Sequence, residues 1–133
     1  MNNDISITPH YVAKNKDAWG IEMRGTEAVD GSDLDHAGIF GLEMTNFKIE
    51  GAGIKKARIK NKRGKWLEYK EGYTELGDGS TITGFEIVGA GYILAIHLKG
   101  GQWMTPVFTS DEEGNVLVGT GAPIDAIWID TAW

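Results

Sequence analysis

Three short stretches decide the fold of this chain: Ile39-Phe40-Gly41-Leu42-Glu43-Met44, Ile82-Thr83-Gly84-Phe85-Glu86-Ile87 and Ile124-Asp125-Ala126-Ile127-Trp128-Ile129. They follow one another at steps of 43 and 42 residues, so three such units fill the 133 residues. A repeat of this size indicates a supersecondary unit that cannot bury its apolar face alone. The spacing predicts one closed domain, residues 1–133, with pseudo-threefold symmetry and repeats at about 5–46, 47–88 and 89–133.

Two further matches support the repeat. Residues 26–32 match residues 74–80 at five of seven positions, and residues 47–53 resemble residues 85–91. Each unit is predicted to contain an alternating strand, a Trp hairpin, an acidic glycine-rich loop and a closing strand. Trp66 and Trp103 are expected at equivalent, largely buried positions, with Trp19 as a weaker third copy.

The strand patterns predict an all-β fold. Ala57-Arg58-Ile59-Lys60 alternates small or apolar residues with charged ones, as a half-buried strand does. Residues 92–96 and 127–129 are rich in β-branched and aromatic residues, which pack well on a pleated surface. Three repeats of about four short strands can close as a β-prism or, alternatively, as a β-trefoil. The long alternating closing strand favours the β-prism-like arrangement.

Composition narrows the function classes. The net charge of −6 argues against sequence-independent nucleic-acid binding, although residues 55–65 are locally basic. No segment reaches the length of about 18 apolar residues expected of a membrane helix, and the first residues lack a signal-peptide pattern. The absence of Cys excludes disulfides and thiolate metal sites but leaves the compartment open.

Nothing in the sequence points to catalysis. His10, His36 and His97 are far apart and lack metal-ligand spacing, and no Gly-x-Ser-x-Gly nucleophile motif is present. The carboxylates recur in equivalent loops, such as Asp30 and Asp78, whereas a glycosidase requires an asymmetric pair. We therefore expect a protein that is not an enzyme and that uses neither a metal nor another cofactor.

The units resemble the clostridial hydrophobic repeats with a conserved Trp, the ChW repeats. His97 stands six residues before Trp103, Trp66 is followed by Tyr69 and Gly72, and residues 119–121 precede the closing strand at 124–129. The resemblance covers residues 47–130 well and the first 46 poorly. Only the third copy approaches the Gly-Thr-x-Gly motif of the family, in residues 119–121, and the Gly-Trp pair is broken in all three. The resemblance implies a secreted or cell-surface bacterial module that binds glycans or other surface polymers, while the residues alone also allow a cytoplasmic protein.

Aromatic side chains beside acidic loops carry the functional prediction. An aromatic face can pack on the C–H face of a sugar, while carboxylates and amides bind its hydroxyl groups. The sequence predicts a lectin-like, non-catalytic carbohydrate-binding module; the alternative is a protein-docking or structural subunit of a secreted or toxin assembly. Its partner is then a glycan or surface polymer, or a protein, without nucleic acid or membrane insertion. The predicted ligand-binding residues are Tyr69, Tyr73, Asp78, Trp103, Asp111 and Asn115.

Overall fold

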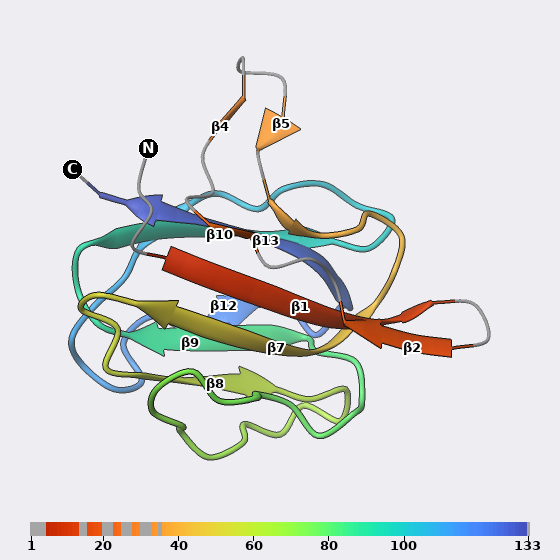
Figure 1. The fold of residues 1–133 in the computed structure, drawn as a ribbon, viewed down its shortest axis with the longest axis horizontal. Coiled ribbons are helices and arrows are strands. Elements are labelled where there is room, and N and C mark those ends of the chain that lie inside the picture. Colours follow the sequence, from red (N-terminus) through yellow and green to blue (C-terminus); the bar gives the residue numbers. More distant parts are fainter. Residues whose placement is uncertain are drawn as a thin grey trace.

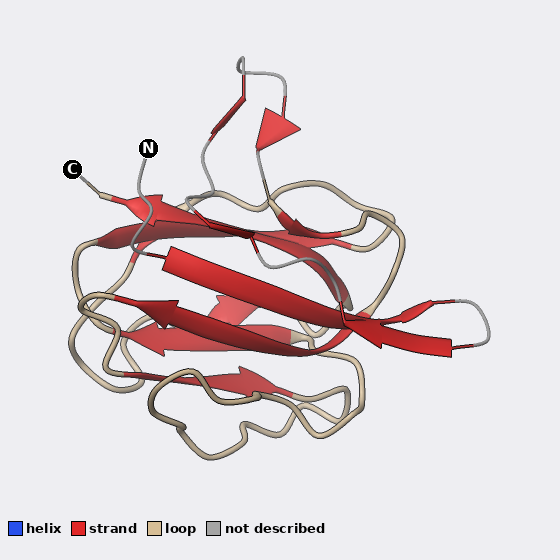
Figure 2. Ribbon diagram, viewed as in Figure 1, coloured by secondary structure: helices blue, strands red, loops and turns tan. Residues whose placement is uncertain are grey.

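The described part of the chain consists of strands and loops and contains no helix (Figure 2). The computed structural model describes residues 5–13, 16–19, 23–24, 28–29, 33–34 and 36–132, and the side chains of Ile7 and of residues 36–132. The all-β prediction is confirmed for these residues. The strands are β1 Ile5–Ala13, β2 Lys16–Trp19, β3 Met23–Arg24, β4 Ala28–Val29, β5 Asp33–Leu34, β6 Ala37–Gly38, β7 Met44–Gly51, β8 Lys56–Lys60, β9 Gly84–Val88, β10 Tyr92–Leu98, β11 Val107–Phe108, β12 Val118–Gly119 and β13 Ile124–Thr131.

Antiparallel pairs organise these strands into sheets (Figure 1). One sheet has the order β2-β1-β3, with β7 also paired to β1; a second has the order β11-β10-β13-β6; a third has the order β12-β9-β8. Strands β4 and β5 form a separate two-stranded ribbon. In Figure 1, β1 and β7 lie between the β10–β13 pair above and the β8–β9 pair below. None of the sheets closes into a barrel among the described strands, so neither the β-prism-like arrangement nor the β-trefoil alternative is confirmed.

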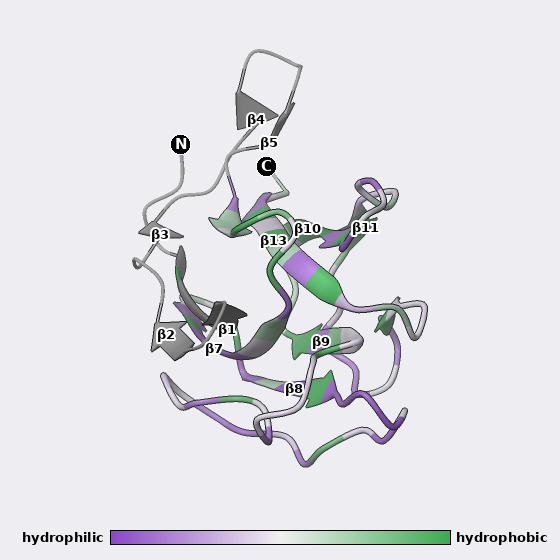
Figure 3. Cartoon of the chain, turned by 90° about the vertical axis from the view of Figure 1, so that its right-hand side faces the viewer, coloured by the Kyte–Doolittle hydropathy of each residue, from purple (hydrophilic) through white to green (hydrophobic). Residues whose placement is uncertain are grey.

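A single apolar core lies against these sheets. Strands β1, β6, β7, β8, β9, β10 and β13 all contribute buried side chains to it. Phe47 of β7 and Phe85 of β9 meet edge to face at its centre, with ring centroids 5.3 Å apart. Burying one such side chain contributes about 1.5–3 kcal/mol. By contrast, the loops beyond β8 are largely hydrophilic (Figure 3).

The predicted alternation of residues 57–60 is confirmed in β8. Ala57 and Ile59 are buried, whereas Lys56, Arg58 and Lys60 are half-buried on the other face. The neighbouring strand β9 is buried on both faces, because loop residues cover the side that carries Glu86. Strand β8 therefore has one core face and one cationic face.

The same close backbone contact occurs at four glycines. A Cβ on Gly38, Gly77, Gly89 or Gly119 would collide with the carbonyl oxygen of Asp125, Thr45, Gly53 or Thr83, respectively. At Gly77, φ is 122°, a conformation that only glycine adopts without strain. The strands that follow are also linked at their starts: Ile82 N donates to Met44 O (2.9 Å), and Ile124 N donates to Ile82 O (3.0 Å).

The first copy of the sequence signature does not form the predicted strand. Residues 39–42 form a turn in which Ile39 and Phe40 are 45% and 42% exposed, and β7 begins at Met44. The linked residues are therefore Met44 and Ile124, which begin β7 and β13, and Ile82, which lies two residues before β9; they are separated by 38 and 42 residues. The match between residues 47–53 and 85–91 has the same spacing of 38 residues. The match between residues 39–44 and 82–87 has a spacing of 43 residues and does not agree with the structure.

The two central Trp residues take corresponding positions in their hairpins. Trp66 pairs with Lys60 at the end of β8, and Trp103 pairs with His97 on β10. Both side chains are half-buried and lie outside the core cluster, so they are less buried than the sequence predicts. In the first hairpin, Trp19 of β2 pairs with His10 of β1, but its side chain lies outside the described residues.

Candidate functional site

The segment 70–79 forms one wall of a surface pocket beside β7. It is tied to β8 by the pair Ala57–Lys70, whose two N···O distances are 3.0 and 2.9 Å. It is tied to β7 by the pair Phe47–Leu76, with N···O distances of 3.1 and 2.8 Å. Because both ends of the segment are bonded to strands, the residues between and beside these pairs have fixed positions.

The pocket is a shallow depression that is open to solvent, with a volume of about 470 Å³ and a lining that is equally polar and apolar. Asn46, at the start of β7, is 5% exposed, and its Nδ2 donates to Glu75 Oε1 at 2.8 Å. A carboxylate has about four acceptor positions, so this single bond leaves Glu75 able to accept bonds from a ligand. The residues that line the pocket are Asn46, Lys70, Glu75, Gly77, Asp78 and Gly79.

Asp78 lines this pocket, but its carboxylate also shapes the turn that carries it. Its Oδ1 accepts bonds from Ser80 N (3.0 Å) and Ser80 Oγ (2.7 Å), and its Oδ2 accepts a bond from Asn61 Nδ2 (3.1 Å). The bond from the Ser80 hydroxyl is the main reason that the pKa of Asp78 is lowered. Asp78 is thus both a turn residue and an exposed pocket residue.

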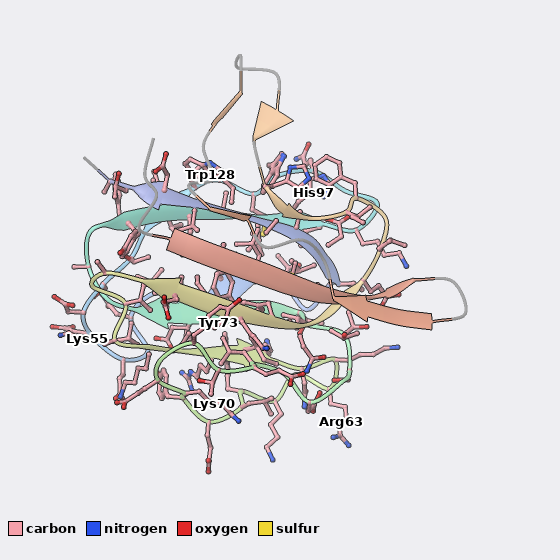
Figure 4. The ribbon with its side chains drawn as sticks, viewed as in Figure 1. Lys55, Arg63, Lys70, Tyr73, His97 and Trp128 are labelled. Carbon is pink, nitrogen blue, oxygen red and sulfur yellow. The ribbon has the colours of Figure 1, made fainter. Side chains whose placement is uncertain are left out.

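The two predicted tyrosines, Tyr69 just before the segment 70–79 and Tyr73 within it, have different surroundings. Tyr73 is 41% exposed, and Lys48 Nζ lies 5.8 Å from the centre of its ring (Figure 4). The ring of Tyr69 instead faces two cations, with Arg58 Cζ at 4.4 Å and Lys56 Nζ at 4.7 Å. Two cations packed against Tyr69 leave little of its ring free to pack on a sugar, which is the role predicted for it.

Tyr69 belongs to a network around the buried carboxylate of Glu86. The hydroxyl of Tyr69 and Nε of Arg58 each donate to Glu86 Oε1 at 2.7 Å, and Gly114 N donates to Oε2 at 2.5 Å. Burial, followed by the bond to Glu86, raises the pKa of Tyr69. The network fastens the loop at Gly114 to β8 and β9, so its role is structural.

Trp103 lies in a separate aromatic cluster on another face. Phe40 is stacked between His36 and His97, at centroid distances of 4.3 and 4.1 Å, and Trp103 stands at a steep angle to all three rings. His97 Nδ1 is 2.6 Å from Oδ1 of the fully buried Asp125, whose Oδ2 accepts a bond from Gly41 N at 2.7 Å. His97 is thus a packed strand histidine, which is the interpretation that its sequence context favours.

Asp111 and Asn115 lie on a third surface, the turn after β11. Asp111 Oδ1 accepts a bond from Ala90 N (3.1 Å) and pairs with Lys55 Nζ (3.3 Å). Asn115 Nδ2 donates to Ser110 Oγ at 2.9 Å. Both side chains are exposed, and their bonds stabilise the turn.

The structure therefore distributes the six predicted residues over several places. Tyr73 and Asp78 lie on the segment 70–79 and Tyr69 just before it, and only Asp78 among the six lines the pocket beside β7. The pocket also contains Glu75, which belongs to the repeated Thr-Glu motif, and Asn46 and Lys70, which no motif distinguishes. Asn46 reaches this site because its neighbour Phe47 pairs with Leu76, a contact that no local sequence pattern indicates.

The donor set of this pocket suits hydrogen bonding. It combines two carboxylates, one amide and one ammonium group, and its glycines permit close approach of a ligand to the backbone. No group of three or more His, Asp or Glu side chains suited to a metal ion occurs among the described residues. Within the same residues, no helix is long and apolar enough to span a membrane. Comparisons with protein-family models, curated proteins and solved structures give no match.

Proposed function

We propose that this protein is a non-catalytic, lectin-like module that binds carbohydrate in the pocket lined by Asn46, Lys70, Glu75 and Asp78. The observation that carries the proposal is the chemistry of this lining. Carboxylates accept hydrogen bonds from sugar hydroxyl groups, while the amide and the ammonium group donate to hydroxyl and ring oxygens. Charge-assisted bonds of this kind are about twice as strong as neutral ones.

Tyr73 supports the proposal from beside the pocket. It lies on the same fixed segment, three residues after Lys70 and two before Glu75, and its ring is 41% exposed. An exposed aromatic ring can pack on the apolar face of a sugar that extends beyond the pocket. Asp78 remains a contact residue in this proposal, whereas Tyr69, Trp103, Asp111 and Asn115 do not.

The proposal also covers the repeat architecture of the chain and its location in the cell. We infer three units of about 42 residues in a β-prism-like arrangement, related to the ChW repeats and placed at a bacterial cell surface. The glycine contacts support it: with unit boundaries near 46 and 88, Gly38, Gly77 and Gly119 each lie in a different unit and each contacts another unit in cyclic order. Gly89 adds a second contact from the third unit to the second. A small binding site of this kind has low affinity on its own, so retention on a polymer would depend on several sites.

The test is Glu75→Gln, assayed on a glycan array and then by titration calorimetry with the best glycan. The amide oxygen of Gln can still accept the bond from Asn46, so the fold is preserved. The loss of charge should weaken glycan binding by about tenfold, or roughly 1.4 kcal/mol. Glu71→Gln is the matched control, because Glu71 is exposed on the same segment but does not line the pocket. Equal affinity of the two variants, or no glycan bound by the wild type, would refute the proposal.

One observation favours the alternative, a protein-docking module that contacts a second copy of the chain. Phe108 and Leu117 are 64% and 47% exposed, and Leu117 lines an apolar groove of about 140 Å³ between β10 and β12. Exposed apolar surface beside a groove is typical of protein contacts. If the array shows no binding and light scattering shows self-association that Phe108→Ser abolishes, the docking alternative replaces the carbohydrate proposal.

A further inference from the structure

The basic stretch at residues 55–65 divides into two parts. It contains seven of the 13 Lys and Arg residues of an acidic chain. The three at its start are neutralised: Lys55 pairs with Asp111 (3.3 Å), Lys56 pairs with Glu113, and Arg58 Nε is 2.7 Å from Glu86 Oε1. These three cations stabilise the protein itself.

The other four cations lie at the end of the hairpin. Lys60, Lys62, Arg63 and Lys65, here called the basic tip, make no ion pair with a described residue. Lys62, Arg63 and Lys65 are exposed, and Lys60 is half-buried. Two acidic groups on neighbouring segments are bonded by other residues: Glu43 by Thr81 and Lys99, which together with Lys62 lower its pKa, and Asp78 by Ser80 and Asn61. The basic tip is thus a local concentration of positive charge without an ion pair among the described residues.

A buried asparagine holds the basic tip in one conformation. Asn61 is 1% exposed, and its Oδ1 accepts bonds from the backbone N–H groups of Arg63 and Lys65, both at 3.0 Å. Its backbone oxygen accepts bonds from Gly64 N (2.9 Å) and Thr83 Oγ1 (2.8 Å). A fixed backbone lowers the entropy lost when a ligand binds, which favours recognition.

The cations converge at one end of the hairpin. Lys60 is the last residue of β8, and Lys62, Arg63 and Lys65 lie on the turn that follows, in which Gly64 N donates to Asn61 O (2.9 Å). Four positive charges on one turn suit a ligand that carries several anionic groups. Lys55 and Arg63 lie at opposite ends of β8, with Arg63 at the outer edge of the molecule (Figure 4). A polymer can therefore contact the basic tip without reaching the paired cations at the other end.

We propose that the basic tip binds a linear polysaccharide or polyol that carries phosphate or sulfate groups. Nucleic acid is a poorer match, because the tip contains no aromatic residue on which a base can stack. The nearest candidate, Trp66, packs against Arg58, whose Cζ is 4.8 Å from its ring centre. This site is separate from the pocket around Glu75 and does not depend on the carbohydrate proposal.

The experiment measures retention of the full chain on immobilised dextran sulfate and on polyglycerol phosphate at increasing salt, with uncharged dextran as the blank. We expect salt-sensitive retention on at least one charged polymer, and the two columns distinguish sulfate from phosphate. The variant Lys62→Gln/Arg63→Gln/Lys65→Gln should lose at least about tenfold in affinity at moderate salt and show a shallower salt dependence, because fewer counterions are released. These side chains are exposed, so circular dichroism and melting should match the wild type.

The matched control is Lys55→Gln/Lys56→Gln/Lys99→Gln, which removes the same charge from paired cations. It should retain binding, as should Glu75→Gln, which separates this proposal from the carbohydrate pocket. Equal loss in the two triple variants would mean that only net charge matters, and the proposal would fall. No retention of the wild type on either charged polymer, or stronger binding to a single-stranded oligonucleotide than to both of them, would also overturn it.

Discussion

At the scale of single residues, Glu86 shows how a charge is accommodated beside the core. It is 1% exposed, but its two oxygens accept bonds from Arg58, Tyr69 and Gly114. Burying a carboxylate is costly unless partners of this kind compensate for the lost water. The sequence pattern places Glu86 on the opposite face of β9 from Phe85, but it does not reveal that loop residues cover this face.

Glu86→Gln should therefore destabilise the fold strongly. The change leaves Arg58 without its counter-charge and replaces one acceptor oxygen by a donor, and breaking a buried pair in this way costs about 3–5 kcal/mol. Urea unfolding followed by Trp fluorescence measures the loss. Glu113→Gln is the control, because Glu113 pairs with Lys56 at an exposed site and such pairs contribute about 0–1 kcal/mol. Similar midpoints for the two variants would show that the Glu86 network does not stabilise the fold.

At the scale of elements, the strands are joined by close backbone contacts that only glycine permits. Gly77 lies against the Thr45 carbonyl at the start of β7, just as Gly119 lies against Thr83 before β9. A side chain at either position would force two segments of the fold apart. The tight packing at these crossings thus depends on the absence of a Cβ atom.

Gly77→Ala should destabilise the protein by about 1–3 kcal/mol from backbone strain alone, and further through the clash with Thr45. Gly79→Ala provides the comparison within the same loop, because φ is 90° at Gly79 but no atom lies within 4 Å of the added Cβ. Thermal unfolding should place Gly77→Ala clearly below Gly79→Ala. If the proposed threefold architecture is correct, Gly38→Ala and Gly119→Ala should behave like Gly77→Ala; a mild effect at all three would contradict close contact there.

Local patterns predict the elements better than they predict the site. The alternation of residues 57–60 and the β-branched residues of 124–129 indicate strands, because burial on a pleated surface imposes that composition. The Ile-Phe-Gly match at residue 39 is misleading, since a turn can share three residue types with a strand. The face of Tyr69 is occupied by cations from β8, and Asn46 reaches Glu75 only through strand pairing. Such contacts depend on tertiary structure and leave no local signal.

At the scale of the whole molecule, three titrating groups bound the pH range of stability. A bond from Thr81, followed by one from Lys99, lowers the pKa of Glu43 from its ordinary 4.5, and bonds from Ser80 lower that of Asp78 from 3.8. Their contribution is present above these ordinary values and is lost as the pH falls through the lower pKa values of the folded state. Burial raises the pKa of Tyr69 above 10.0, so its contribution is present below pH 10 and is lost above it.

We therefore expect the unfolding free energy to be nearly constant with respect to these groups between about pH 5 and 9, and to fall on both sides. Denaturant unfolding at intervals from pH 2.5 to 11 tests this. Lys99→Met should reduce the loss on the acid side, because Glu43 then titrates closer to its ordinary pKa. If the unfolding free energy of this variant falls at low pH as much as that of the wild type, the bond to Lys99 does not contribute to stability in acid.

The pairing of β6 with β13 has a consequence for how the chain reaches this structure. Ala37 and Gly38 bond to Ile127 and Ala126, and β10 bonds to the same strand from its other side. During synthesis, the edges of β6 and β10 that face β13 therefore have unpaired N–H and C=O groups until residues 124–131 have been made. Non-local pairing of this kind makes folding slow, and open strand edges invite pairing between molecules. The nascent chain is thus exposed to aggregation until β13 inserts between β10 and β6, and a helper that shields β10 during that interval would raise the yield of folded protein.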